Sequence, residues 1–223
     1  MSRLTRRISL VVVAVLAGSL LAAPPARSLT VQPFAIATAD GERTGLVARP
    51  DDSTAVRGRP LVILLHGHMG SAEQVFGRTK AASPMAVWLD IVDRDRIVVV
   101  ALDGMMGGDN QRGWNDCRAG APGNPTSDDV GFVSAVVRRL GRELAIDTTR
   151  VHAMGMSNGA MMAFRLAIEL RPPLAAFAAV CGSMADGGSC GPPPRAVSAL
   201  VIAGTTTRLS RKKPHASSAH SKS

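Results

Sequence analysis

The stretch GMSNG, residues Gly155–Gly159, decides how the rest of the chain can fold. It reads G-x-S-x-G, follows a strand-like run over 150–154 and precedes a helical pattern over 160–170. This order of strand, sharp turn and helix predicts a strained turn that pushes Ser157 above the edge of a sheet as a nucleophile. Glycine is needed on both sides because larger side chains would collide across the turn. The alternative is a glycine-rich turn without chemistry.

Two backbone N–H groups are expected to stabilise the oxyanion that a serine nucleophile creates. The N–H of Asn158 is one, because free N–H groups and the positive end of the helix dipole face the serine at the start of the helix. The loop HGHMG, His66–Gly70, follows the apolar run 61–65 and is placed to supply the other donor from His68. An ordinary strand-ending glycine turn is the alternative for this loop.

Strands and helices are expected to alternate along the body of the chain. Short apolar runs predict strands, and runs with helical spacing predict helices. We expect strands at 43–49, 61–65, 97–102, 150–154, 175–180 and 199–203, and helices at 72–78, 85–94, 130–144 and 160–170. This alternation predicts an α/β fold in which a mainly parallel sheet carries helices on both faces.

Length and charge divide the chain into one domain with two distinct ends. The 223 residues suffice for a single domain with a sizeable core, which we place at 28–205. The formal net charge of +9 comes from four arginines in 1–27 and five basic residues in 206–223, and the interval between them is neutral. The body therefore gives no electrostatic reason to expect a nucleic-acid partner. The basic end, 206–223, is predicted to be disordered because it lacks apolar periodicity.

The N-terminal segment 1–27 has the layout of a signal peptide. Arginines precede the apolar run 8–23, and small residues and prolines follow it. A membrane-spanning helix is the alternative, but the run is short for the ~20 residues that a span requires. The pair Arg6 and Arg7 also suggests twin-arginine export. We therefore expect secretion, with no stable membrane partner after cleavage.

Three cysteines lie in a chain that is expected to reach an oxidising compartment, namely Cys117, Cys181 and Cys190. One disulfide is expected, and all three pairings remain open. A metal site is not expected, because the sequence contains no C-x-x-C motif and no clustered histidines.

The segment 105–126 is rich in Gly, Asn and Pro and is expected to form a long loop at the carboxyl end of a strand. Such loops often carry functional residues. Trp114, Asn115 and Asp116 are the candidate substrate-binding residues, with Trp114 stacking against an aromatic or sugar ring. An equally good interpretation makes Trp114 a lid over the core.

The base and the acid that a serine nucleophile requires are harder to place. In an enzyme of this architecture they follow the nucleophile in the order acid, then histidine. After Ser157 the only histidines are His215 and His220, both in the basic tail. Asp186 lies between glycine-rich residues, where a turn role is favoured.

The remaining titratable groups near these motifs are expected to be structural. His152 lies inside the predicted strand, where a packed histidine is favoured. Asp103 follows a strand, and Asp128 and Asp129 begin a helix for which Ser127 is the expected N-cap.

Five motifs occur here in one order: 64–67 (LLHG), 100–104 (VALDG), 113–116 (GWND), 128–132 (DDVGF) and 155–159 (GMSNG). Together they resemble the secreted polyhydroxybutyrate depolymerase and feruloyl esterase-like family of α/β-hydrolases, over about 59–203. The resemblance implies an α/β-hydrolase fold and a serine carboxylic ester hydrolase that needs no cofactor. It also implies an ester substrate, such as hydroxyalkanoate oligomers, feruloylated sugars or acetylated polysaccharide, cleaved through an acyl-enzyme at Ser157.

The sequence departs from this family after 199–203. There the family continues into a Gly-Thr-x-Asp turn that supplies the acid, and later into a loop that bears the histidine, whereas Thr207 stands here at the aspartate position. We therefore expect a fold that lacks its last elements and a chain with weak activity or none. The competing hypothesis is a non-catalytic secreted protein that binds a polymer or ester through the Trp114 loop and the pocket above Ser157.

Overall fold

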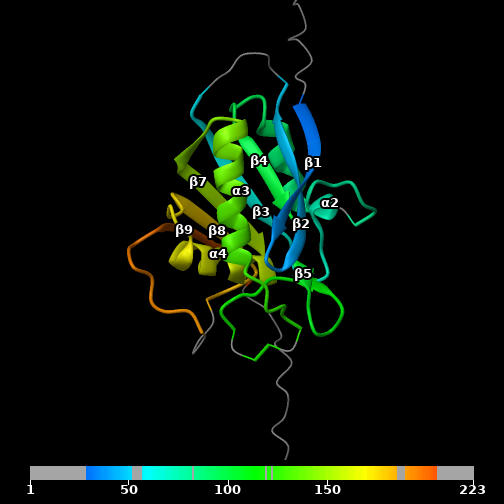
Figure 1. The fold of residues 1–223 in the computed structure, drawn as a ribbon, viewed down its shortest axis with the longest axis vertical. Coiled ribbons are helices and arrows are strands. Elements are labelled where there is room, and N and C mark those ends of the chain that lie inside the picture. The colour runs from blue at the N-terminus through cyan, green and yellow to red at the C-terminus, as the bar shows by residue number, and fades with distance from the viewer. Residues whose placement is uncertain are drawn as a thin grey trace, which may run out of the picture.

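The computed structural model describes residues 29–51, 57–81, 83–118, 120–121, 123–184 and 189–204. The strands of its main sheet are β1 (Leu29–Thr38), β2 (Gly41–Pro50), β3 (Arg59–Leu65), β4 (Val98–Leu102), β7 (Ile146–Met156), β8 (Ala176–Val180) and β9 (Ser198–Ile202). Within the described residues these seven strands lie in the order β1-β2-β4-β3-β7-β8-β9 (Figure 1). β4, β3, β7, β8 and β9 are parallel to one another, and β2 is antiparallel to β4 and to β1. The predicted α/β fold with a mainly parallel sheet is confirmed.

The central strands end level with one another. Leu65 at the end of β3 lies beside Leu102 of β4 on one side and Gly155 of β7 on the other. β3 and β4 are buried along nearly their whole length, as expected for continuous apolar runs in a parallel sheet. The loops after β3, β4 and β7 therefore leave the sheet at the same edge, where α/β folds commonly bind ligands.

Helices cover both faces of the sheet, as predicted. α3 (Asp129–Glu143) and α4 (Asn158–Glu169) pack on one face, and α3 lies in front of the sheet in Figure 1. α2 (Ala72–Val75) and the 3₁₀ helix η1 (Pro84–Ile91) pack on the other face. The segment predicted to be helical at 85–94 is thus a 3₁₀ helix, which begins after Ser83 and has a proline in its first position.

Two local features differ from the sequence-based expectation. β1 was not predicted, because its proline and polar residues blur the strand pattern; proline is tolerated here because β1 is an edge strand. The N-cap of α3 is Asp128, not Ser127: the Asp128 carboxylate accepts the N–H of Gly131 at 2.8 Å. Ser127 instead donates its hydroxyl to Asp129 at 3.2 Å.

Several predictions fall on residues outside the described ranges. These are the signal peptide 1–27, the tail 206–223 with His215, His220 and Thr207, and Asp186. Across the described part of the chain, every helix is too short or too polar to cross a membrane.

Candidate active site at the end of β7

Ser157 occupies the sharp turn between β7 and α4, as the G-x-S-x-G pattern predicts. Its backbone has φ 54° and ψ −119°, a region that is costly for a residue with a side chain, by about 1–3 kcal/mol. The backbone N–H of Ser157 donates to the carbonyl of Val180 at 2.9 Å, which holds the turn against the end of β8. The residue is exposed. The fold therefore maintains a strained conformation that presents the hydroxyl to solvent.

Glycine is required on both sides of this serine for steric reasons. A Cβ on Gly155 would overlap the backbone of Gly159 across the turn. A Cβ on Gly159 would overlap the carbonyl groups of Leu65 and His66 at the end of β3. Because both positions hold glycine, the first turn of α4 can approach the loop that follows β3.

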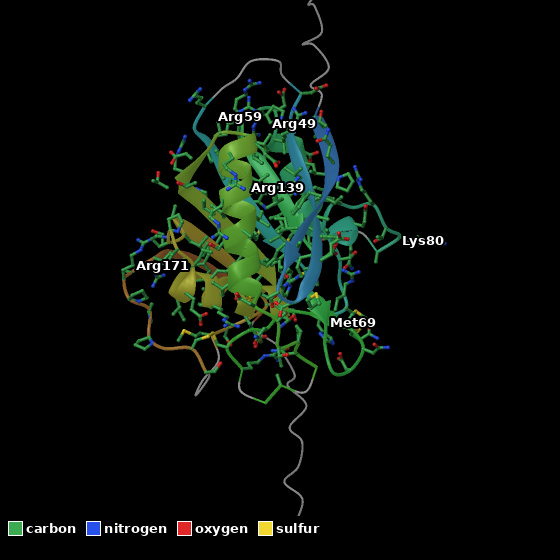
Figure 2. All side chains as sticks on the ribbon, viewed as in Figure 1. Arg49, Arg59, Met69, Lys80, Arg139 and Arg171 are labelled. Carbon is green, nitrogen blue, oxygen red and sulfur yellow. A yellow bond between two sulfur atoms is a disulfide. The ribbon has the colours of Figure 1, made fainter. Side chains whose placement is uncertain are left out.

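That approach brings the His66–Gly70 loop beside the serine. A Cβ built on Gly67 would lie 3.6 Å from the Cβ of Ser157. Met69, the exposed methionine of this loop (Figure 2), donates its N–H to the carbonyl of Arg112 in the short strand β6 (Arg112–Gly113), which pairs with β5 (Met105–Met106).

The two residues predicted to supply the oxyanion donors, Asn158 and His68, line the same cavity as Ser157. Asn158 begins α4, so its N–H has no carbonyl partner within the helix. In the neighbouring loop, Met69 donates its N–H to Arg112 and Gly70 donates to Gly67, whereas the N–H of His68 makes no hydrogen bond with a described residue. The assignment of Asn158 and His68 as oxyanion donors stays a prediction, to which this geometry is favourable.

A cavity of about 280 Å³ opens in front of the serine. It is lined by residues of the His66–Gly70 loop, the loop after β6 and the start of α4, namely His68, Arg118, Ala121, Gly123, Asn124, Ser157, Asn158 and Met161. A larger cavity of about 460 Å³ lies along the middle of the sheet, beside His152 and Trp88, and does not include Ser157 among its lining residues. The smaller cavity is the candidate substrate site because it contains the nucleophile.

The side chain of Asn158 ties this turn to the loop after β6. Its amide nitrogen donates to Asp116 at 2.6 Å, and its amide oxygen accepts the backbone N–H of Trp114 at 2.7 Å. Asp116 is buried and also accepts hydrogen bonds from Arg118 and Asn124. The wall of the cavity is thus fixed by one buried carboxylate.

The predicted substrate-binding role of Trp114, Asn115 and Asp116 needs correction. Trp114 has 0% exposure, and its indole nitrogen donates to the carbonyl of His66 at 2.9 Å. It cannot stack against a substrate ring from this position, so its burial supports the alternative interpretation, in which Trp114 is a lid over the core. Asn115 donates its side-chain amide to Ser127, and Asp116 is buried in the network described above. The three residues shape the loop from within.

Two histidines near the sheet are unsuited to serve as a base. His66 donates from Nδ1 to the carbonyl of Gly67 at 2.7 Å and accepts the N–H of Gly104 at Nε2 at 2.9 Å. Burial lowers the pKa of His66, which agrees with this neutral, fully bonded imidazole. His152 lies five residues before Ser157 in β7, about 16 Å away at the rise of a strand.

The third described histidine, His68, lies in the cavity beside the serine. Its Nε2 is 2.7 Å from Oδ2 of Asp109, and both side chains are partly exposed, at 33% and 38%. From the sequence, only the backbone N–H of His68 was predicted to act at the site. The side-chain pair could not be predicted, because 41 residues separate the partners and no local pattern connects them.

The acidic residues expected to be structural occupy structural positions. Asp103 accepts the N–H of Ala72 at 2.9 Å and the hydroxyl of Thr44 at 2.8 Å. Asp129 is buried and forms an ion pair with Arg43 at 2.6 Å. Burial raises the pKa of Asp129, and the neighbouring Arg43 opposes that rise.

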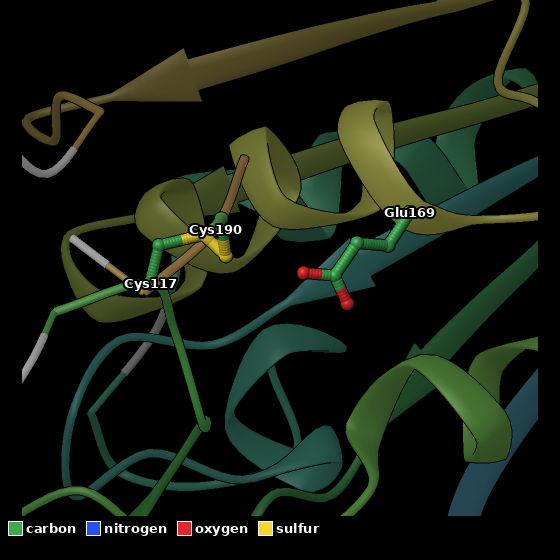
Figure 3. Close-up of side chains that lie close together, drawn as sticks. All are labelled: Cys117, Glu169 and Cys190. Carbon is green, nitrogen blue, oxygen red and sulfur yellow. A yellow bond between two sulfur atoms is a disulfide. The ribbon is translucent and has the colours of Figure 1, made fainter. Parts of the chain in front are cut away.

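Cys117 and Cys190 form a disulfide, and Cys181 is free and exposed. The bond joins the loop after β6 to the segment that leads into β9. Glu169 lies beside it, with a carboxylate oxygen and both sulfur atoms within 4.8 Å of one another (Figure 3). A cysteine binds a metal ion through its thiolate form. Both sulfur atoms here are joined in a disulfide, so neither is a thiolate. The carboxylate of Glu169 is the one ligand that this cluster offers to a metal ion.

Two curated relatives are similar to this chain in sequence. "Putative esterase NocK" of Nocardia uniformis subsp. tsuyamanensis is 34% identical over 140 residues, covering 62% of this chain and 37% of that protein. Feruloyl esterase B of Piromyces equi is 29% identical over 154 residues, covering 67% of this chain and 26% of that protein. The chain thus spans well under half the length of these relatives. No protein-family model matches it.

Solved structures of esterases share the fold. A mutant feruloyl esterase module from Clostridium thermocellum, complexed with sinapinate, has a TM-score of 0.54 at 12% identity and covers 73% of this chain and 57% of that one. An acetyl xylan esterase from Paenibacillus sp. R4 has a TM-score of 0.51 at 18% identity and covers 70% of this chain and 50% of that one. The predicted α/β-hydrolase fold is confirmed, as is the resemblance to feruloyl esterase-like proteins, and the relatives are carboxylic ester hydrolases.

Proposed function

We propose that this chain is a serine carboxylic ester hydrolase that forms an acyl-enzyme at Ser157. The observation that carries the proposal is the strained, exposed Ser157 at the mouth of a cavity of about 280 Å³. Attack of its Oγ on an ester carbonyl would form a tetrahedral oxyanion. The N–H groups of Asn158 and His68, two residues that line the cavity with Ser157, are the proposed donors to that oxyanion.

The cavity favours a small acyl group. Its volume of about 280 Å³ falls just below the ~300–1,000 Å³ typical of pockets that enclose a drug-sized ligand. An acetyl group or a short hydroxyacyl unit fits inside, and a larger alcohol part would remain outside. We therefore propose acetyl esters of polysaccharide and hydroxyalkanoate oligomers as the substrate classes that this cavity favours, with acetyl esters turned over fastest. Feruloyl esters of polysaccharide, which the family resemblance also implies, carry a larger acyl group and should be turned over more slowly.

Turnover is expected to be slow if no other residue replaces the acid and base that the family resemblance implies. Thr207 stands at the position where the family resemblance implies the acid, and the tail histidines have no apolar anchor in the sequence. In serine proteases of other folds, loss of the triad still leaves roughly 10³–10⁴-fold acceleration over water through the oxyanion hole and binding. A weak but measurable esterase is therefore the expected behaviour.

We also propose that the protein is exported with removal of its first residues. The support is the arginine-led apolar run that ends at prolines within 1–27. N-terminal sequencing of secreted material should find a start between Ala22 and Ser28. Recovery of an intact Met1 end from the membrane fraction would refute export.

The test of the hydrolase proposal is hydrolysis of a nitrophenyl acetate by the purified mature chain and by Ser157→Ala. Turnover above the buffer rate that is lost in Ser157→Ala supports the proposal. Absence of turnover, together with binding of an acetylated polysaccharide, would support the non-catalytic alternative instead. That alternative binds a polymer or ester through the Trp114 loop and the pocket above Ser157, and the buried Trp114 ring itself can take no part in such binding.

A further inference from the structure

We propose that His68 and Asp109 form the acid–base pair that serves Ser157 in this chain. His68 is the base, and Asp109 is the residue that positions it. This inference rests on the hydrolase function proposed above, and it supplies a base that does not depend on the tail histidines.

The pairing of the two side chains selects the tautomer that a base requires. Oδ2 of Asp109 lies 2.7 Å from Nε2 of His68 and accepts its proton in a hydrogen bond. With the proton on Nε2, the lone pair of Nδ1 is free to accept another. No described residue makes a hydrogen bond to Nδ1. An imidazole oriented by a carboxylate is the arrangement that activates a serine in other hydrolases.

The free nitrogen lies near the start of α4, and no hydrogen bond joins it to Ser157 in this structure. A Cβ built on Gly113 would lie 3.2 Å from Nδ1 of His68 and 3.1 Å from the side-chain oxygen of Asn158, so both atoms border the same small space. His68 and Ser157 line one cavity, and the residue before His68 is Gly67, which lies against Ser157. A substrate held in that cavity would contact both side chains.

Two glycines make room for this pair. A Cβ on Gly123 would lie 2.7 Å from Oδ2 of Asp109 and 3.5 Å from Cε1 of His68. Gly113 borders the adjacent ring atom, Nδ1. The imidazole and carboxylate thus lie between two segments of the 105–126 loop, at positions where any larger residue would displace them.

The proton and bond changes balance without any further reactant. As Oγ of Ser157 bonds to the ester carbonyl carbon, its proton moves to Nδ1 of His68 and the carbonyl oxygen becomes the oxyanion. When the intermediate collapses, the bond to the alcohol breaks, and Nδ1 gives its proton to the departing alkoxide. Nδ1 then takes a proton from water, whose oxygen attacks the acyl carbon. The second collapse releases the carboxylic acid and returns the proton to Oγ.

The test compares three variants in the acylation of the enzyme by nitrophenyl acetate. His68→Ala removes the imidazole but keeps the backbone N–H, so it separates the base from the oxyanion donor. Asp109→Asn keeps an acceptor for the N–H of Gln111, which bonds to Oδ1, and so preserves the turn. His152→Ala, on β7 and outside the cavity, is the matched control, and thermal melts show that each variant is folded.

His68→Ala is expected to lower the acylation rate by about 10²–10⁴-fold, the usual contribution of general acid–base catalysis. Added imidazole should restore part of that rate in His68→Ala but not in Ser157→Ala. Asp109→Asn should lower kcat with KM unchanged, and His152→Ala should retain the normal rate.

The experiment distinguishes failure of the His68–Asp109 inference from failure of the hydrolase proposal. If Ser157→Ala abolishes turnover while His68→Ala and Asp109→Asn stay within about twofold of the parent, the pair is not the base and the hydrolase function stands. If imidazole does not rescue a folded His68→Ala, its loss is structural and the inference is overturned. If Ser157→Ala itself is unaffected, the hydrolase proposal fails.

Discussion

The side-chain amide of Asn158 donates to the buried carboxylate of Asp116 across 2.6 Å. This hydrogen bond joins the residue after the nucleophile to the loop that forms the wall of the cavity. The same asparagine accepts the N–H of Trp114, so one side chain fixes both partners. The position of Ser157 relative to the cavity therefore depends on a polar contact between two distant segments.

Replacement of Asn158 tests this dependence. Asn158→Ala keeps the backbone N–H but leaves Asp116 and the N–H of Trp114 each without one buried partner. We expect a loss of about 1–3 kcal/mol in the free energy of unfolding, and a lower kcat because the cavity wall moves. Urea denaturation and ester kinetics measure the two effects. Gln32→Ala on exposed β1 is the control and should change neither quantity.

The tight approach of α4 to β3 predicts a strong contrast between two glycines. Gly159→Ala places a methyl group into the carbonyls of Leu65 and His66, whereas Gly191 has no atom within 4 Å of its would-be Cβ. Overpacking at Gly159 should cost about 1–3 kcal/mol and reduce esterase activity. Gly191→Ala should leave the melting temperature and the activity unchanged. Equal melting temperatures for the two variants would contradict the packing described here.

The Cys117–Cys190 disulfide is expected to stabilise the domain by about 2–4 kcal/mol, because it closes a loop across 73 residues of sequence separation. The double variant Cys117→Ser/Cys190→Ser should therefore melt at a lower temperature, and a reducing agent should lower the melting temperature of the parent. Cys181→Ser is the matched control, since that thiol is free and exposed. A destabilisation by Cys181→Ser as large as that of the double variant would contradict this pairing.

The buried ion pair between Arg43 and Asp129 gives a pH-dependent prediction. Arg43→Met leaves the carboxylate buried without its partner and should cost about 3–5 kcal/mol at neutral pH. Burial already raises the pKa of Asp129, and loss of Arg43 removes the main opposing charge. The folded state then binds a proton more tightly than the unfolded state does. The free energy of unfolding of Arg43→Met should accordingly fall as pH rises through the raised pKa of Asp129.

Denaturation of Arg43→Met across a pH series measures how steeply its free energy of unfolding changes with pH. Arg43→Met/Asp129→Asn carries no buried carboxylate at this site, so its stability should show a shallower pH dependence. A free energy of unfolding that rises with pH in Arg43→Met would contradict the raised pKa of Asp129.

Short sequence patterns predicted those features of this protein that depend on residues close together in the sequence. The glycine spacing around Ser157 fixes a turn within five residues, and continuous apolar runs identify β3 and β4 as buried strands. The alternation of these elements was enough to predict the sheet and its two helical layers.

Contacts between distant segments could not be predicted in this way. The sequence left Trp114 open as a substrate-binding residue or a lid over the core, and the folded loop places its ring against His66 in the core. The partner of Cys117 and the pairing of His68 with Asp109 depend on how the 105–126 loop returns to the sheet edge. No periodicity in the sequence predicts the course of this loop, so these contacts could be identified only in the structure.

The most direct test of the central claim is to identify the residue that carries the acyl group. The mature chain is mixed with nitrophenyl acetate, quenched in acid within the first turnover, digested and examined by mass spectrometry. The account predicts one acetyl group on the peptide that contains Ser157, and none on that peptide in Ser157→Ala. Nitrophenol release at the parent rate by Ser157→Ala, or an acetyl group found only on other residues, would contradict it.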